Sequence, residues 1–219
     1  MIRGTSILYT PRTEFNGITI IDPISSLTNW TIVGNIAAIN SGIVDNKLKF
    51  SSISGYSSTE SYFYNQATYA GAFALCVDFS GFVLTTNSGA RIAHAVFRMT
   101  DYANANLVFG IGYDGLVPEF TDGTGYRVWT FDGASNVERA FVVSAETQGK
   151  FAFIANSDRS SVQAYKRKID DSGWDLIYTG NLSSILNGKT LFADIGLSGG
   201  LALAGDVVSF SNFASVVIL

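Results

Sequence analysis

Five side chains on predicted strands have the chemical types that bind hydroxyl-rich ligands: Asp78, His94, Arg98, Arg127 and Trp129. Strand alternation places His94 and Arg98 on one face of residues 90–99. It places Arg127 and Trp129 together on one face of their own strand. A flat aromatic ring stacks on the apolar ring hydrogens of a sugar, while charged and amide groups bond the hydroxyls. We therefore take these five residues as the candidate ligand-binding set; the alternative is that Trp129 is core and the charges are ordinary solvated positions.

The sequence lacks the residue sets of the common hydrolytic and metal-dependent enzymes. Glu119 and Asp122 stand three residues apart in a predicted loop, and Glu138 and Glu146 are too distant in sequence to share one strand face. His94 is the only histidine, and no nucleophile elbow surrounds a serine. One histidine and one cysteine are too few for a standard zinc site. We expect a non-enzymatic protein without catalytic residues, metal ligands or cofactor.

Calcium is the ion for which the sequence does offer oxygen ligands. Six aspartates lie in or beside predicted turns: Asp114, Asp122, Asp132, Asp170, Asp171 and Asp175. Aspartate is also a common turn residue in its own right, and no EF-hand spacing is present. The pattern favours the turn-forming role and leaves calcium binding as an alternative.

Composition bears on the surface and on the classes of partner. Charged residues make up 15% of the 219 residues, against roughly 25% in typical soluble domains, and mean hydropathy is +0.24. This composition indicates either an unusually neutral surface or a surface of which a sizeable part is buried against other chains. We favour the second interpretation and predict a homo-oligomer, with a trimer as the expected form. The net charge of −4 argues against binding to nucleic acid, which requires a basic face.

Targeting and redox signals are few. No stretch approaches the ~20 apolar residues of a membrane span, and residues 1–15 lack the apolar run of a signal peptide. We expect a soluble protein with no membrane partner and no secretory signal. Cys76 is the single cysteine, which excludes an internal disulfide, and its strand-like surroundings predict a buried apolar position.

The strand pattern is clearest in residues 151–180, where three short alternating segments are separated by turns rich in Asp, Ser and Gly. Across the chain we predict about twelve to fourteen strands and no long amphipathic helix. Residues 51–71 are predicted as a polar connection or edge strand, and Lys166–Lys168 as an exposed strand end. Residues 1–14 are predicted as an extended arm, and residues 15–219 as one β-sandwich domain.

Three parts of this layout resemble the concanavalin A-like lectin/glucanase jelly rolls. They are the hairpins of residues 151–180, the opening run from Trp30 and Gly34 to residues 46–50, and the ending with Ser211-Asn212-Phe213. The resemblance implies an all-β fold of two antiparallel sheets, a concanavalin A-like jelly-roll sandwich. Glycosidases of this fold carry a Glu-x-Asp-x-x-Glu spacing, which is absent here, so the resemblance implies a non-catalytic member. Legume-type lectins of the same fold hold calcium with Asp and Asn on loops.

These observations lead to a first functional prediction and two alternatives. The low charge, the missing signal peptide, the irregular arm and the apolar residues 216–219 predict a structural virion protein. It would be a phage capsid-decoration or tail-fibre module, located in the particle and in contact with its own copies and other virion proteins. The alternative is a lectin-like module that recognises a glycan. A glycoside hydrolase ranks third.

Overall fold

The computed structural model describes residues 22–34, 39–52, 56–83, 92–101, 107–116, 125–144, 146–202, 205 and 207–218. The predicted arm of residues 1–14 lies outside this part of the chain. Among the described residues, no helix has the length and apolar character needed to cross a bilayer. The only helix there is the single turn α2 (Ser183–Leu186).

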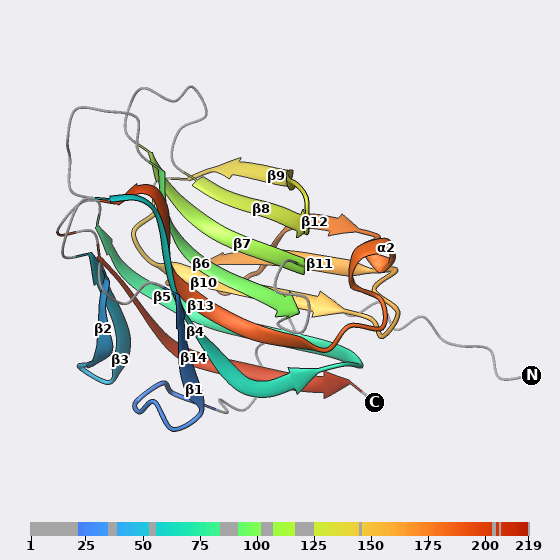
Figure 1. Ribbon diagram of the computed structural model, residues 1–219, viewed down its shortest axis with the longest axis horizontal. Coiled ribbons are helices and arrows are strands. Elements are labelled where there is room, and N and C mark those ends of the chain that lie inside the picture. Colours follow the sequence, from blue (N-terminus) through green and yellow to red (C-terminus); the bar gives the residue numbers. More distant parts are fainter. Residues whose placement is uncertain are drawn as a thin grey trace, which may run out of the picture.

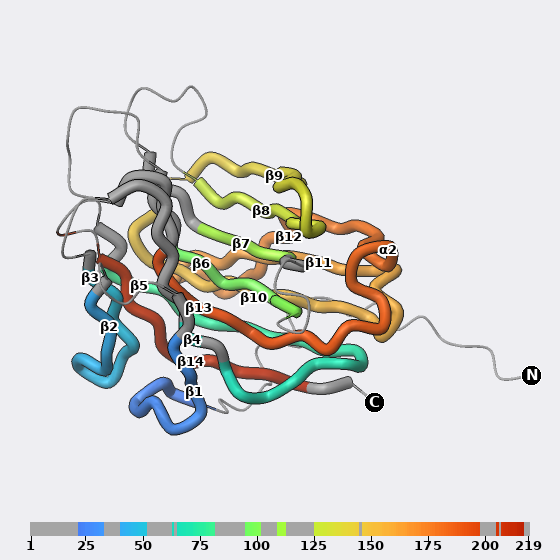
Figure 2. The backbone as a smooth tube through the Cα atoms, in the orientation of Figure 1, coloured from blue at the N-terminus to red at the C-terminus, as the bar shows by residue number. Residues whose placement is uncertain are grey.

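The described strands form two seven-stranded antiparallel sheets that lie face to face (Figure 1). The first sheet has the order β1 (Trp30–Gly34), β4 (Tyr56–Tyr69), β13 (Leu191–Ala202), β6 (Ile92–Asp101), β7 (Leu107–Leu116), β8 (Gly125–Asp132) and β9 (Asn136–Val143). The second has the order β12 (Asp175–Gly180), β11 (Val162–Lys168), β10 (Gly149–Ala155), β5 (Ala72–Val83), β14 (Val207–Ile218), β3 (Lys47–Ser52) and β2 (Ile39–Val44). The predicted all-β jelly-roll sandwich is confirmed. The tube in Figure 2 shows that strands distant in sequence, such as β5 and β14, run side by side.

A layer of aromatic rings fills the space between the sheets. Phe97 of the first sheet stacks on Phe153 of the second at 4.9 Å between ring centroids, and Phe109 contacts the same ring at 4.7 Å. Phe79 and Phe151 stack at 4.5 Å within the second sheet. Each fully buried ring of this kind contributes about 1.5–3 kcal/mol through removal from water. Alternation along the strands supplies these rings, because every second residue points inward.

One strand prediction was wrong. Residues 56–69 form β4, which is neither a connection nor an edge, because it pairs with β1 on one side and β13 on the other. Its buried side chains include Asn65 and Tyr69 as well as Phe63. Since polar atoms interrupt the apolar alternation, the sequence pattern alone does not indicate an internal strand.

The prediction of an exposed end at Lys166–Lys168 was also wrong for its first residue. The register places Lys166 opposite Phe151, which points into the core, and Lys166 is only 7% exposed. Its ammonium lies 3.1 Å from Asp175 Oδ2 and 5.2 Å from the centroid of the Tyr126 ring. An ion pair and a cation–π contact together compensate the burial of this charge.

The closing strand contains a bulge where the sequence has Ser211-Asn212-Phe213. Asn212 has a φ of 54°, in the left-handed region that asparagine tolerates better than most residues. The register of β14 with β5 shifts between Ser211 and Ala214 at this point. Phe213 then pairs with Asp22, whose carboxylate accepts a hydrogen bond from the Trp30 indole at 2.8 Å. The bulge therefore ties the beginning of the described chain to its last strand.

A buried arginine joins two turns and the helix beside the core. Arg159 is 1% exposed, and its guanidinium donates hydrogen bonds to the backbone carbonyls of Tyr69, Ala70, Gly71, Asn156 and Ser157. Its own carbonyl accepts from the Leu182 amide at 2.9 Å, just before α2. Burial lowers the pKa of this guanidinium, and the charge of Asp158 partly offsets that effect. Arg159 thus joins the β4–β5 turn, the β10–β11 turn and the helix.

Candidate functional site

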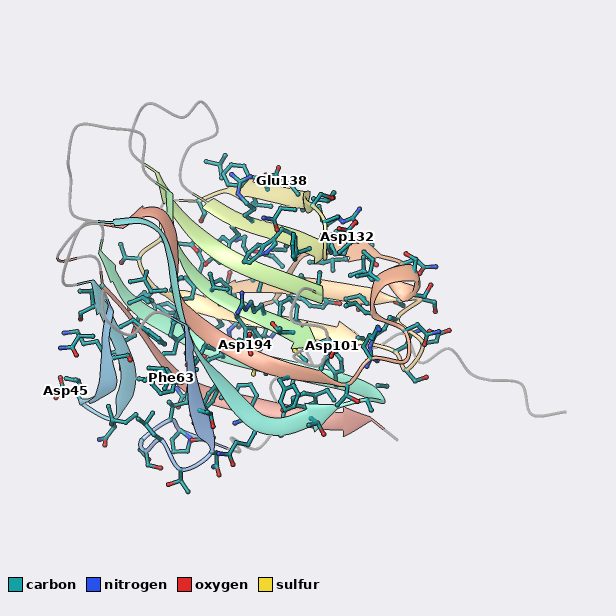
Figure 3. All side chains as sticks on the ribbon, viewed as in Figure 1. Asp45, Phe63, Asp101, Asp132, Glu138 and Asp194 are labelled. Carbon is teal, nitrogen blue, oxygen red and sulfur yellow. The ribbon has the colours of Figure 1, made fainter. Side chains whose placement is uncertain are left out.

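The register of the first sheet aligns five residues of five neighbouring strands in one line across its outer face. Asp194 of β13 is opposite Arg98 of β6, which is opposite Gly110 of β7. Gly110 is in turn opposite Trp129 of β8, which is opposite Glu138 of β9. We call these five residues the cross-strand row. Figure 3 labels the two residues at its ends, Asp194 and Glu138, which come from different parts of the sheet.

Trp129 lies flat across the neighbouring strand because that strand has glycines beneath it. A Cβ atom placed on Gly110 would lie 2.5 Å from the Trp129 Cζ2 atom, and one on Gly112 would lie 3.1 Å from Cζ3. Trp129 itself is neither buried nor fully exposed. The glycines therefore determine how the indole lies on the sheet, and the indole is not part of the core as the alternative prediction had it.

Arg98 is held on the same face by a buried carboxylate. Its Nε atom lies 2.8 Å from Asp194 Oδ2, which also accepts a hydrogen bond from the Thr100 hydroxyl at 2.8 Å. Asp194 is 0% exposed, whereas the Arg98 side chain remains 13% exposed. A buried carboxylate with two donors fixes the position of the guanidinium without covering it fully.

Arg127 is the third predicted residue on this face. It forms an ion pair with Glu138, and its guanidinium lies 4.7 Å from the centroid of the Phe141 ring. Both partners belong to β9, the edge strand of the sheet. The structure thus places Arg98, Arg127 and Trp129, three of the five candidate residues, on one face of the first sheet.

The remaining two predicted residues differ in their placement. His94 lies on β6 opposite Ser198, four residues before Arg98, so it occupies a position on the same face of the strand as Arg98. The structure describes its backbone but not its side chain. Asp78 lies on β5 of the other sheet. There its carboxylate is 2.5 Å from Lys150 Nζ and accepts a hydrogen bond from Asn212 Nδ2 at 2.9 Å. Asp78 therefore does not join the group around Trp129.

Sequence reasoning missed three members of the cross-strand row. Asp194 and Glu138 come from strands whose pairing partners cannot be read from alternation, and a glycine carries no side chain to attract notice. The sequence did contain one indication of this site. Gly110 and Gly112 lie on one face of a strand pattern whose other face carries Phe109 and Ile111. Glycines inside a strand mark close approach by another group.

A separate cavity of about 520 Å³ lies at one end of the sandwich, between the β9–β10 loop and the β11–β12 turn. Its lining includes Glu146, Lys168, Asp170 and Asp171. Burial raises the pKa of Glu146, but hydrogen bonds, led by the one from Tyr126 at 2.5 Å, outweigh it and hold that pKa below its usual range. Lys168 Nζ lies 3.3 Å from the other carboxylate oxygen.

Metal binding is not indicated by the geometry of the described residues, among which no three His, Cys, Asp or Glu side chains gather as ligands. Asp132 shows what a turn aspartate does here: it accepts hydrogen bonds from the Ser135 and Ala134 amides, at 2.9 Å each. These two bonds lower the pKa of Asp132. Calcium binding stays a prediction.

Comparisons with solved structures show the same fold in several lectin-like proteins. No protein-family model and no curated protein matches the sequence. The lumenal domain of VIP36, solved with Ca²⁺ and Man3GlcNAc, is similar with a TM-score of 0.60 and 13% identity, over 91% of this chain and 88% of that one. The carbohydrate recognition domain of Emp46p in its potassium-bound form is similar with a TM-score of 0.58 and 11% identity, over 93% and 98%.

The carbohydrate-binding module CBM66 from Bacillus subtilis is similar with a TM-score of 0.53 and 12% identity, over 86% of this chain and 95% of that one. A GH43 protein from Bacillus licheniformis also matches, with a TM-score of 0.60 and 8% identity, but the match covers 39% of that longer chain. At these identities the likeness concerns the fold. The chain has the lectin-like jelly-roll sandwich that these proteins share.

Proposed function

We propose that this chain is a lectin-like module that binds a glycan on the outer face of its first sheet and carries out no catalysis. The observation that supports this most directly is the cross-strand row, in which an aromatic ring and an anchored guanidinium come from the two strands that flank Gly110, on one face of the sheet. The lectin-like fold of VIP36, Emp46p and CBM66 is consistent with that use.

The chemistry of the row suits a sugar. The Trp129 indole rests on Gly110 and Gly112, so it presents a fixed flat surface that loses little rotamer freedom when a pyranose ring stacks on it. Arg98 is held in place by Asp194 before any ligand arrives, so its guanidinium is positioned to donate to hydroxyls. Pre-organised groups of this kind reduce the entropic cost of binding.

The spacing of carboxylates on this face supports binding rather than hydrolysis. Asp194 and Glu138 are separated by four strand intervals, about 19 Å at ~4.8 Å per interval. Glycosidase carboxylates stand about 5–9.5 Å apart. In addition, Asp194 is fully buried and Glu138 forms an ion pair with Arg127. Neither carboxylate is arranged as one half of such a pair.

A glycan-array screen followed by calorimetry tests the proposal, with and without calcium. We expect a saturable hit whose affinity falls by about tenfold in Trp129→Ala, since loss of one stacking contact removes about 1.4 kcal/mol. Trp174→Ala is the matched control, because Trp174 lies on the second sheet against Tyr165 and Ala152. Circular dichroism verifies that both variants fold. The absence of any hit, or unchanged binding by a folded Trp129→Ala variant, overturns the proposal.

The virion-protein hypothesis remains a second prediction, together with the trimer and the virion location. It is supported by the low charge content and by large apolar side chains exposed on edge strands, among them Val143 at 72% and Leu176 at 50%. Analytical ultracentrifugation of the purified protein tests the oligomer, and a monodisperse monomer at high concentration contradicts it. The two hypotheses are compatible, because a virion protein can also bind glycans.

A further inference from the structure

The outer face of the second sheet carries four cations, on strands β3, β10 and β11. On β3, Lys47 and Lys49 both point outward, because Leu48 and Phe50 point into the core. On the opposite half of the sheet, Arg167 of β11 is directly opposite Lys150 of β10. We call Lys47, Lys49, Lys150 and Arg167 the basic face.

The two halves of the basic face meet over the central strands β5 and β14. Lys150 is opposite Asp78 on β5, two residues before Ser80 on the same face. Lys47 reaches over the sheet, so that its ammonium donates to the Ser80 hydroxyl at 3.0 Å. Lys49 belongs to the same row as Ser80, two strand intervals away or about 10 Å. The four cations therefore surround one strip of sheet.

The strip contains little negative charge, and its carboxylate already has protein partners. Among the described residues that the register places within the strip, Asp78 is the one carboxylate, and it is 7% exposed between Lys150 and Asn212. Asp45 lies at the tip of the β2–β3 turn, at the end of the hairpin (Figure 3). The face thus carries positive charge on a chain whose net charge is −4. Such a local reversal of sign attracts anionic partners.

The small polar side chains between the cations favour a polymer of hydroxylated units that carry anionic groups. Ser80, Ser209 and Ser211 lie between the cations, and their small side chains allow close approach and offer hydroxyls. A peptide would gain no backbone pairing here, because β5, β10 and β14 each pair with two neighbours. Trp174, the indole nearest Arg167 at 5.4 Å, is only 8% exposed and is too covered to stack with nucleic-acid bases.

We propose that the basic face is a second binding surface, selective for anionic polysaccharides that carry carboxylates or sulfate esters. It lies on the sheet opposite Trp129 and does not depend on the glycan site proposed there. Lys47, Lys49, Lys150 and Arg167 contact the anionic groups, and the serine strip accommodates the sugar units between them.

The test is a titration of the full chain with heparin, polygalacturonate and neutral dextran, at about 25 mM and about 300 mM NaCl. We expect binding to at least one of the acidic polysaccharides and none to dextran, with affinity falling as salt rises. The two acidic probes distinguish sulfate from carboxylate as the recognised group. Absence of binding to both at low salt overturns the proposal.

Variants show whether the basic face is responsible. We expect Lys47→Gln/Lys49→Gln to weaken binding by about fivefold or more, since these cations face the ligand directly. Lys168→Gln/Lys189→Gln removes the same charge elsewhere and is expected to change affinity by less than about twofold. An Asp78→Asn/Lys150→Met variant removes an ion pair together, so that no buried charge is left alone, and is expected to weaken binding as well. Equal losses in the two lysine double variants show general charge attraction and refute a defined face.

Two further probes separate polysaccharide from other polyanions. Duplex DNA and polyglutamate are titrated under the same conditions, and we expect both to bind more weakly than the acidic polysaccharide. If either binds as tightly, the surface does not select sugars and the assignment of its ligand is wrong.

Discussion

Replacing Arg159 by methionine removes the guanidinium that joins the β4–β5 turn to the β10–β11 turn, while keeping most of the volume of the side-chain stem. Five carbonyls accept hydrogen bonds from this group, and no carboxylate of the described residues pairs with it. The backbone φ of 61° stays the same in both proteins, since methionine and arginine meet the same steric restriction there. The change therefore isolates the loss of the hydrogen bonds.

The size of the effect follows from which carbonyls stay buried. The Tyr69 carbonyl is buried, and leaving it unsatisfied costs about 1–3 kcal/mol. The carbonyls of Ala70 and Gly71 are partly exposed and can bond water instead. The contact with the Phe73 ring at 5.0 Å contributes about 0.5–1 kcal/mol more. Removing the buried charge restores part of this stability, so we expect a net loss of about 2 kcal/mol, or about 4–8 °C in Tm.

Urea unfolding monitored by tryptophan fluorescence, together with thermal scans, measures this loss. Arg159→Lys is expected to lie between the wild type and Arg159→Met, because an ammonium has fewer donors and lacks the planar geometry. Arg127→Met is the matched control and is expected to cost less than about 1 kcal/mol, because its ion pair is at the surface. If Arg159→Met lowers the free energy of unfolding by less than about 1 kcal/mol, the hydrogen bonds of Arg159 do not stabilise the fold as proposed.

Three further predictions concern single groups. Gly110→Ala places a Cβ 2.5 Å from the Trp129 ring, so we expect a changed near-ultraviolet circular dichroism spectrum and weaker glycan binding in a folded protein; an unchanged spectrum contradicts the geometry. Because the pKa of Glu146 lies below its unfolded value, its contribution to stability is present above about pH 4.3 and lost as pH falls through the folded pKa. We therefore expect the free energy of unfolding of Glu146→Gln to fall less steeply below about pH 4.3 than that of the wild type. The same pH dependence in both proteins contradicts this prediction. Burial, reinforced by the Asp78 carboxylate, raises the pKa of Cys76 to about 12. We expect the thiol to react slowly with a disulfide reagent at neutral pH until urea unfolds the chain. Rapid labelling of the native protein contradicts this prediction.

Much of the sandwich follows from local pattern. The strands predicted around residues 151–180 are observed as Gly149–Ala155, Val162–Lys168 and Asp175–Gly180. They were predictable because Phe151 and Phe153 alternate with smaller residues between turns rich in aspartate, serine and glycine. By contrast, β4 was not predictable as an internal strand, since Asn65 is buried in it.

The candidate site was predictable only in part. Arg127 and Trp129 share one strand, so alternation alone places them together, and Arg98 follows once β6 and β8 belong to one sheet. Asp78 fulfilled the same chemical criteria but lies in the other sheet, where Lys150 and Asn212 engage it. Residue type and alternation cannot distinguish these cases, because neither reports which strands become neighbours.

The sequence by itself determined which side chains point inward along each strand, because alternation is a property of a single extended chain. It also determined where turns occur, since Asp132 or Gly133 bends the chain through local hydrogen bonding and backbone freedom. Only the tertiary structure decided the order of strands in each sheet, and with it the alignment of Asp194, Arg98 and Trp129. The physical reason is that strand pairing joins backbone groups far apart in sequence, and the core contacts that select one pairing exist only after both sheets have closed on each other.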